Sequence, residues 1–340
     1  MTTTGASTVT TTSSLSREDI DRGLRALRGR VLTTPVVRSE DIDRITGTRI
    51  WLKAENLQSG GSFKVRGALL AVARLSASGS RGVVAQSTGN HAIAVALAAR
   101  EYGLPTVIVL PTDASPVKVR RLHELGADVV QVGRLLDERL AEVERIGERR
   151  GYDVVDPYED PDVVTGQGTA TAELISQAEA AYTRLDALVI PVGGGSALAG
   201  ACLAAEGRDV HVLGAEPAAV PALTAALAAG APVTVTAAHT IADGLRPDRI
   251  GALPFSVVRS RVTVVRTVRE PRIREALRLA MTAARLVVEP AAATALAAAC
   301  DLALAEPGRY RNIGVLLSGG NVDPGLLRSA LSDEDGNGRH

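Results

Sequence analysis

Short apolar segments alternate with helical segments along most of this chain, and this alternation constrains the fold more than any other feature. The apolar segments do not alternate strictly between apolar and polar residues, which indicates strands that are buried on both faces. Strands of this kind, separated by helices, form parallel sheets that are covered by helices on both sides. The sequence therefore predicts an α/β fold with parallel-rich sheets. The predicted strands include "GVVAQS", "TVIVLP", "DVVQVG", "ALVIPVG", "DVHVLGAE", "RVTVVRTV" and "NIGVLLSGG".

Composition and charge exclude several functional classes. The 340 residues include 38 basic and 38 acidic ones, and 2% are aromatic. Nucleic-acid-binding proteins usually have a basic excess or aromatic stacking surfaces, so we expect no nucleic-acid partner. No apolar run reaches the roughly 18 residues that a membrane-spanning helix needs, and the Thr- and Ser-rich start lacks the pattern of a secretory signal. We therefore expect a cytoplasmic protein with no membrane partner and with disordered tails over residues 1–15 and 331–340.

Ligands of open α/β sheets bind where strands end and helices begin, and four such places here carry small or polar residues. The first is "SGGSFKVRGALL", in which Lys64 follows a glycine-rich loop and Phe63. Glycines let the backbone approach a ligand closely, and partial burial lowers the pKa of a lysine amine and makes it nucleophilic. On its own, this motif also fits an exposed loop lysine.

The second place is "STGNHA", residues 87–92, between a strand and a helix. Free backbone N–H groups at a helix start bind anions, and the side chains of Ser87, Thr88 and Asn90 add hydrogen-bonding groups. This combination suits a small carboxylate. His91 lies in the first helical turn, where we interpret it as orienting the loop rather than as a catalytic group.

The third and fourth places follow two further strands. "PVGGGSALAG", residues 191–200, brings bare amides and a helix start together and predicts a phosphate site, with a plain tight turn as the alternative. It lacks the lysine of a P-loop and the spacing of a dinucleotide site. In "LLSGGNVD" a strand delivers Ser318 to its C-terminal end, where a hydroxyl can hydrogen-bond a ring nitrogen or simply end the strand. An aldehyde for the lysine, a phosphate for the glycines and a ring nitrogen for the serine occur together in pyridoxal phosphate.

With these motifs, the chain resembles the fold-type II pyridoxal-phosphate enzymes, and within them the threonine/serine dehydratase and serine racemase group. The resemblance implies two α/β lobes like those of the tryptophan synthase β chain, with the cofactor in the cleft between them. The implied large domain covers residues 16–81 and 157–330, and the implied small mobile domain covers 82–156, with the Pro- and Asp-rich stretch 156–162 at the crossing. The matching motifs are "KAENLQSGGSFKVRGA", "STGNHAIAVA", "DPYEDPDVVTGQGT", "VIPVGGGSALAG", "VLGAEP", "IADGL", "VVEPAAATALAAA" and "LLSGGNVD".

The resemblance also implies roles for individual residues. Lys64 would hold the cofactor covalently and then act as the base at the substrate α-carbon, with Phe63 against the cofactor. Asn90 would hydrogen-bond the phenolic oxygen of the cofactor, and Ser318 would face its pyridine nitrogen. The residues implied to hold the phosphate are Gly193, Gly194, Gly195 and Ser196. The residues implied to hold the substrate carboxylate are Ser87, Thr88, Gly89, Asn90 and His91.

Three positions depart from the family's pattern. Ser196 replaces the usual fourth glycine of the phosphate loop, and its hydroxyl can donate to the phosphate. Thr88 stands where dehydratases often have alanine and racemases have a serine that acts on the opposite face, so it is either a catalytic hydroxyl for racemisation or a carboxylate ligand. Glu216 matches one cation ligand of the racemases, but "PAAVPA" after it has no acidic residue. We therefore expect no complete metal site, and a weakly held divalent or monovalent cation stays open.

The resemblance implies an ammonia-lyase, a pyridoxal-phosphate-dependent carbon–oxygen lyase that removes the β-hydroxyl of L-threonine or L-serine and releases a 2-oxo acid and ammonia. The alternatives are a serine-type racemase, a lyase for an uncommon β-substituted amino acid, and a non-catalytic binding protein. The joint presence of Lys64, Asn90 and Ser318 argues against the last of these. The family also implies a homo-oligomer, either a dimer or a tetramer. Because the chain ends soon after "SGGNVD", we expect no C-terminal regulatory domain.

Overall fold

The computed structural model describes residues 15–87, 89–114, 116–133 and 136–332. Thr88 and most of both predicted tails lie outside the described residues. The predicted C-terminal tail starts too early, because Leu331 and Ser332 belong to the last helix, α13 (Pro324–Ser332). This helix packs against α11 (Glu270–Thr282) with Ala330 buried, and that tertiary contact has no local sequence signal.

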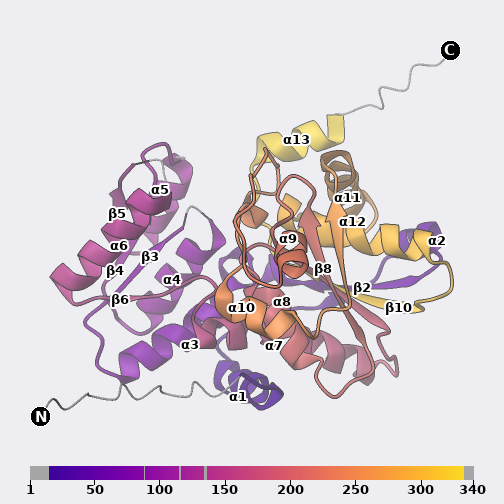
Figure 1. Cartoon of the computed structure of the whole chain (residues 1–340), viewed down its shortest axis with the longest axis horizontal. Coiled ribbons are helices and arrows are strands. Elements are labelled where there is room, and N and C mark those ends of the chain that lie inside the picture. Colours follow the sequence, from indigo (N-terminus) through magenta and orange to yellow (C-terminus); the bar gives the residue numbers. More distant parts are fainter. Residues whose placement is uncertain (1–14, 88, 115, 134–135, 333–340) are drawn as a thin grey trace, which may run out of the picture.

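Two sheets organise the molecule (Figure 1). The larger has six strands in the order β1-β2-β10-β7-β8-β9, and all pairings in it are parallel except that of β1 with β2. The smaller has four parallel strands in the order β5-β4-β3-β6. The predicted α/β class is confirmed. The strands are β1 (Val36–Val37), β2 (Arg49–Ala54), β3 (Val83–Gln86), β4 (Thr106–Leu110), β5 (Asp128–Gln131), β6 (Asp153–Val154), β7 (Ala187–Pro191), β8 (His211–Pro217), β9 (Val264–Val268) and β10 (Asn312–Leu317).

Helices cover both sheets and separate their strands. The four-stranded sheet with α4, α5 and α6 forms one side of the molecule, the four-stranded lobe, and the six-stranded sheet with its helices forms the other, the six-stranded lobe (Figure 1). In the described part of the chain, no helix is both long and apolar enough to cross a membrane. The remaining helices are α1 (Arg17–Leu27), α2 (Glu40–Thr46), α3 (Lys64–Ala77), α4 (Asn90–Glu101), α5 (Pro116–Glu124), α6 (Leu136–Arg150), α7 (Pro161–Ala180), α8 (Ser196–Ala204), α9 (Ala222–Ala229), α10 (Ala252–Val258) and α12 (Pro290–Ala305).

Helix α7 packs against α3 on one side and α8 on the other, and glycines allow the close approach at both crossings. A Cβ atom built on Gly166 would collide with the backbone of Gly67 in α3. A Cβ atom built on Gly200 of α8 would lie 2.6 Å from the Cα of Gly168 in α7. At both crossings the backbone of α7 is in direct contact with the backbone of its neighbour. These contacts fix the positions of α3 and α8 relative to α7.

We expect Gly200→Ala to lower the free energy of unfolding by about 1–3 kcal/mol or more, because the added methyl must displace backbone rather than a flexible side chain. Urea-induced unfolding measures this loss. The matched control is Gly147→Ala in α6, where a Cβ atom would meet one carbonyl oxygen, that of Tyr152, at 3.1 Å. Equal losses in the two variants would contradict close backbone packing as the cause.

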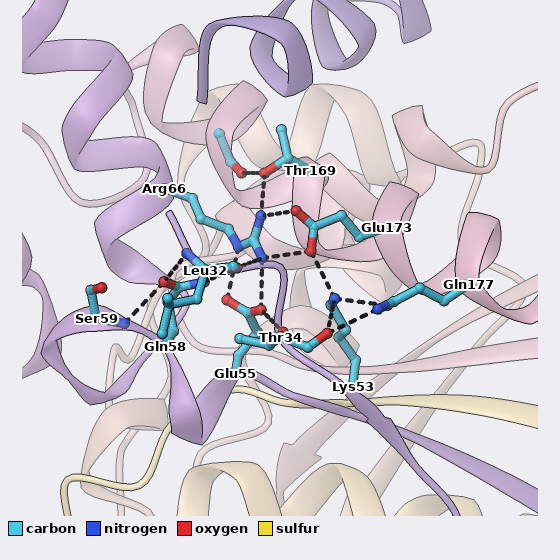
Figure 2. A network of polar contacts seen from close by, with 11 residues as sticks. Leu32, Thr34, Lys53, Glu55, Gln58, Ser59, Arg66, Thr169, Glu173 and Gln177 are labelled. Atoms are coloured by element: carbon cyan, nitrogen blue, oxygen red, sulfur yellow. Dashed lines mark hydrogen bonds and ion pairs between the residues drawn. The ribbon is translucent and has the colours of Figure 1, made fainter. Parts of the chain in front are cut away.

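A buried polar network ties α3 and α7 to the end of β2 (Figure 2). The fully buried guanidinium of Arg66 donates to both carboxylate oxygens of Glu55 and to both of Glu173, at 2.8 Å in each case. The amine of Lys53, also fully buried, donates to Glu173 at 2.7 Å, to a side-chain amide and to a backbone carbonyl. Two cations therefore face two carboxylates, which offsets the cost of removing these charges from water.

Candidate active site

Lys64 is the first residue of α3, and its amine points toward the glycine loop that follows β7. The Nζ atom donates to the carbonyl oxygen of Pro157 at 3.0 Å and to Oγ of Ser196 at 3.4 Å. It lies 5.4 Å from the centre of the Phe63 ring. Lys53 is held by the buried network, so among the lysine side chains that the structure describes, Lys64 is the one whose amine reaches the predicted phosphate loop.

Burial lowers the pKa of the Lys64 amine from 10.5 to about 8, against the opposing effect of the carboxylates of Asp156 and Glu289. An amine with this pKa is unprotonated in about half of the molecules at pH 8. The neutral amine is the form that attacks a carbonyl and accepts a proton from carbon. The environment of Lys64 therefore meets the requirement that was set from the sequence, a lysine made nucleophilic by burial.

The glycine loop, residues 193–196, leads from β7 into α8. Gly195 has a φ of +99°, a conformation that disfavours any residue with a Cβ atom. A Cβ atom on Gly194 would collide with the ring of Tyr158, and one on Gly193 would lie 2.9 Å from the carbonyl oxygen of Gly244. The side chain of Ser196 is buried and donates to the Pro157 carbonyl at 3.2 Å. The start of α8, where the first N–H groups of a helix have no partner within it, therefore lies next to the Lys64 amine through Ser196, which suits an anion site.

Ser318 stands just past the end of β10 and is 3% exposed. Its Oγ atom has no hydrogen-bond partner within the described residues. Its carbonyl oxygen accepts the Phe63 N–H at 3.0 Å, which places it beside the start of α3. A buried hydroxyl without a partner costs free energy, so this group is suited to pair with a ligand atom.

Ser87, Gly89 and Asn90, at the start of α4, are partly exposed. The side-chain oxygen of Ser87 accepts the N–H of Gly89 at 3.1 Å, and a Cβ atom on Gly89 would have open space around it. Asn90 donates through Nδ2 to both carboxylate oxygens of Glu289, at 2.9 Å each. Thr88 lies outside the described residues, so its predicted catalytic and binding roles stay predictions.

His91 is buried, and Nε2 hydrogen-bonds to the carbonyl oxygen of Val155 at 2.8 Å. A carbonyl oxygen only accepts, so Nε2 carries the proton and Nδ1 is an acceptor, which has no partner among the described residues. Burial, together with the nearby charge of Lys64, lowers the pKa of His91 from 6.5 to about 3. The bond to Val155 agrees with the interpretation that His91 orients the loop.

We expect His91 to make the protein less stable in acid. Its pKa is about 3 in the folded chain against 6.5 ordinarily, so below pH 6.5 the unfolded chain binds a proton that the folded chain does not. The free energy of unfolding is therefore unaffected by His91 above pH 6.5. Between pH 6.5 and pH 3 it falls as the pH falls, by up to about 1.4 kcal/mol per pH unit. Urea unfolding between pH 7 and 4 should show a shallower decline for His91→Asn. The exposed His123→Asn variant is the control and should keep the full decline.

Two residues at the site, Glu289 and Asn321, were not predicted from the sequence. Glu289 is buried at the start of α12, and Asn321 donates to Oδ1 of Asn90 at 2.8 Å. A Cβ atom on Gly319 would lie 2.7 Å from Oε1 of Glu289, which places this carboxylate next to Ser318. Both residues lie in motifs that match the family, "VVEPAAATALAAA" and "LLSGGNVD", but the sequence alone indicated no role for either side chain.

Glu216, the candidate cation ligand, has both carboxylate oxygens engaged in protein contacts. They accept the N–H groups of Leu223 and Thr224 and the Thr224 hydroxyl, at 2.8, 3.0 and 2.5 Å. These N–H groups are at the start of α9, where a carboxylate is stabilising. No group of three or more His, Cys, Asp or Glu residues that could hold a metal gathers in the part of the chain that the structure describes.

The residues present fit pyridoxal phosphate. The Lys64 amine can bond the aldehyde of this cofactor, and the helix start at Ser196 can hold its phosphate. The Ser318 hydroxyl, which has no partner among the described residues, can contact its ring nitrogen. Asn90 lies next to Gly319, so it is on the same side of the site as Ser318. The residues predicted to contact the cofactor thus come together, although more than 250 residues of sequence separate the first from the last.

Known proteins resemble this chain over nearly its whole length. The family model described as "Pyridoxal-phosphate dependent enzyme" matches residues 27–319. An L-threo-3-hydroxyaspartate ammonia-lyase from a Pseudomonas species is 38% identical over 91% of this chain and 96% of that protein. The L-threonine ammonia-lyase of Thermotoga maritima is 36% identical over 92% of this chain and 77% of that protein. A structure of maize serine racemase matches with a TM-score of 0.88 and 33% identity, over 94% of this chain and 97% of that one.

Proposed function

Because the chain belongs to the family of pyridoxal-phosphate-dependent enzymes, we propose that it is an ammonia-lyase. It removes the β-hydroxyl of a small hydroxy amino acid and releases a 2-oxo acid and ammonia. The observation that carries this proposal is the position of the Lys64 amine, which lies between the glycine loop and the Phe63 ring with a pKa lowered to about 8. Such an amine is suited to take a proton from the substrate α-carbon near neutral pH.

The other residues of the site bind the cofactor and the substrate. Bound pyridoxal phosphate supplies a ring that accepts negative charge from the substrate α-carbon. The start of α8, with Ser196, holds the phosphate, and the loop of residues 87–91 holds the substrate carboxylate. Ser318 donates to or accepts from the ring nitrogen without adding a charge there. Asn90 would hydrogen-bond the phenolic oxygen with one of its two Nδ2 hydrogens, which then leaves one oxygen of Glu289.

The substrate is proposed to be a β-hydroxy amino acid such as L-threonine or L-serine, and the relatives add L-threo-3-hydroxyaspartate. The test supplies each of the three to the holoenzyme and measures oxo acid, ammonia and the chirality of the remaining amino acid together. Equimolar oxo acid and ammonia are expected for one of them. Inversion of the α-carbon without oxo-acid release would instead support a racemase, the activity that names the maize neighbour.

Replacing Ser318 with aspartate is expected to slow elimination and to permit transamination. A carboxylate beside the ring nitrogen raises the pKa of that nitrogen, and a protonated ring withdraws more charge from the α-carbon and holds it longer. The measurement compares oxo-acid release with the appearance of the aminated form of the cofactor, which absorbs at a different wavelength. Unchanged elimination with no transamination would contradict this role.

We propose further that the chain is a cytoplasmic homo-oligomer, a dimer or a tetramer, in which residues 82–156 move relative to the large domain of residues 16–81 and 157–330. The family resemblance supports this proposal. Sedimentation velocity of the holoenzyme tests the oligomeric state, and a monomer at micromolar concentration would overturn it.

A further inference from the structure

Arg121 connects the two lobes at the edge of the site. It lies on α5, in the four-stranded lobe, which Figure 1 shows to one side of the six-stranded sheet. Its Nη1 atom donates to Oδ1 of Asn321 at 2.8 Å, and its Nη2 atom approaches the Gly60 carbonyl oxygen at 3.5 Å. Gly60 precedes Lys64 by four residues and Asn321 follows Ser318 by three, so both acceptors belong to segments that carry site residues.

The hydrogen bonds continue from Asn321 into the site. Asn321 donates through Nδ2 to the Gly60 carbonyl at 2.7 Å and to Oδ1 of Asn90 at 2.8 Å. Asn90 in turn donates through Nδ2 to both oxygens of Glu289. A continuous chain of hydrogen bonds therefore runs from the guanidinium of Arg121 to a buried carboxylate beside Ser318.

The chemistry of the two ends fixes the direction of every bond between them. A guanidinium only donates and an ionised carboxylate only accepts, whereas each amide has one donating and one accepting end. Arg121 therefore requires the oxygen of Asn321 on its side, and Glu289 requires the nitrogen of Asn90 on its side. Both amides are thereby held in one orientation, and the bond at the Arg121 end is strengthened by its charge.

We propose that Arg121 is a positioning residue, which couples the position of α5 to the orientation of Asn321 and Asn90. When Arg121 is in place, the lobes are joined and Asn90 is oriented. When α5 moves away, Asn321 loses the partner of its oxygen and the two amides become less ordered. This inference rests on the proposed function only in that the cofactor lies beside Asn90.

The test compares Arg121→Ala with Arg120→Ala, its exposed neighbour on the same helix. Loss of a charge-assisted hydrogen bond predicts that kcat falls by about 10-fold to 100-fold in Arg121→Ala. KM should change less, because Arg121 does not contact the substrate and Asn90 is one of five residues proposed to hold the substrate carboxylate. The absorbance maximum of the bound cofactor should also shift, because the hydrogen bond to its phenolic oxygen weakens. Arg121→Lys should recover part of both effects, and Arg120→Ala should leave both unchanged.

A double-mutant cycle decides whether Arg121 acts through Asn321. In an Asn321→Ala background, Arg121→Ala should lower kcat by less than about 2-fold, because the two residues belong to one hydrogen-bond chain. An undiminished effect in that background would overturn the proposal and indicate a direct contact with substrate. An unshifted absorbance together with unchanged kcat would also overturn it. Absence of lyase activity in the wild-type holoenzyme would overturn the proposed function, while the absorbance shift would still test the role of Arg121.

Discussion

Replacing Lys64 with alanine is expected to lower kcat by about 10⁴-fold or more. A positioned general base alone contributes about 10²-fold to 10⁴-fold, and Lys64 is also the nucleophile that anchors the cofactor. Lys64→Arg should fail equally, although it keeps the charge, because a guanidinium neither forms the covalent bond nor gives up its proton near neutral pH. Both variants should lose the absorbance band of the covalently bound cofactor.

Peptide mapping provides an independent check on the same residue. Borohydride reduction of the wild-type holoenzyme should fix the mass of the cofactor on the peptide that contains Lys64. The chain has two other lysines, Lys53 and Lys118, so the result is unambiguous. Cofactor on either of those peptides, or an active Lys64→Ala variant, would contradict the assignment and with it the proposed function.

Replacing Arg66 with alanine is expected to lower the free energy of unfolding by about 3–5 kcal/mol, because it leaves a buried carboxylate without its cation. Glu55 is fully buried and has Arg66 as its ion-pair partner, while Glu173 would keep only Lys53. The loss should appear as a lower urea midpoint in the apoprotein, so that bound cofactor does not mask it.

Arg74 on the same helix supplies the matched control. It pairs with Asp160 and Asp162, but its side chain is 52% exposed, so Arg74→Ala should cost no more than about 1 kcal/mol. Similar losses in the two variants would mean that the burial of the Arg66 ion pairs contributes little to the free energy of unfolding. The comparison separates a buried ion pair from an exposed one while helix and residue type stay the same.

Some features of the site could be predicted because they are local. The glycines before Ser196, the lysine after a glycine loop and the serine after an apolar strand each have a signature within about ten residues. The structure places the Lys64 amine at Ser196 and, within the described residues, gives the Ser318 hydroxyl no partner, while the cofactor contacts of both groups stay predictions. Glu289 was missed because its importance depends on Asn90, which is 199 residues away in sequence.

Glu216 is a residue for which the structure adds a role that the sequence did not indicate. The sequence allowed a weak cation at this residue, but the structure directs its carboxylate to the start of α9. Helix α9 is short and has no side-chain cap from the residue just before it, and Glu216, seven residues before Leu223, caps it instead. The carboxylate therefore has protein partners in this structure, and the open question of a weakly held cation stays a prediction.

The sequence by itself determined the α/β class and predicted four strand ends as ligand-binding places, because periodicity and turn chemistry are properties of neighbouring residues. Only the tertiary structure decided which groups meet. It placed α7 between two glycine crossings, buried Arg66 between two carboxylates, and linked Arg121 to Glu289 through two amides. These outcomes depend on burial and on contacts between distant segments, and the same forces lower the pKa of the Lys64 amine to about 8.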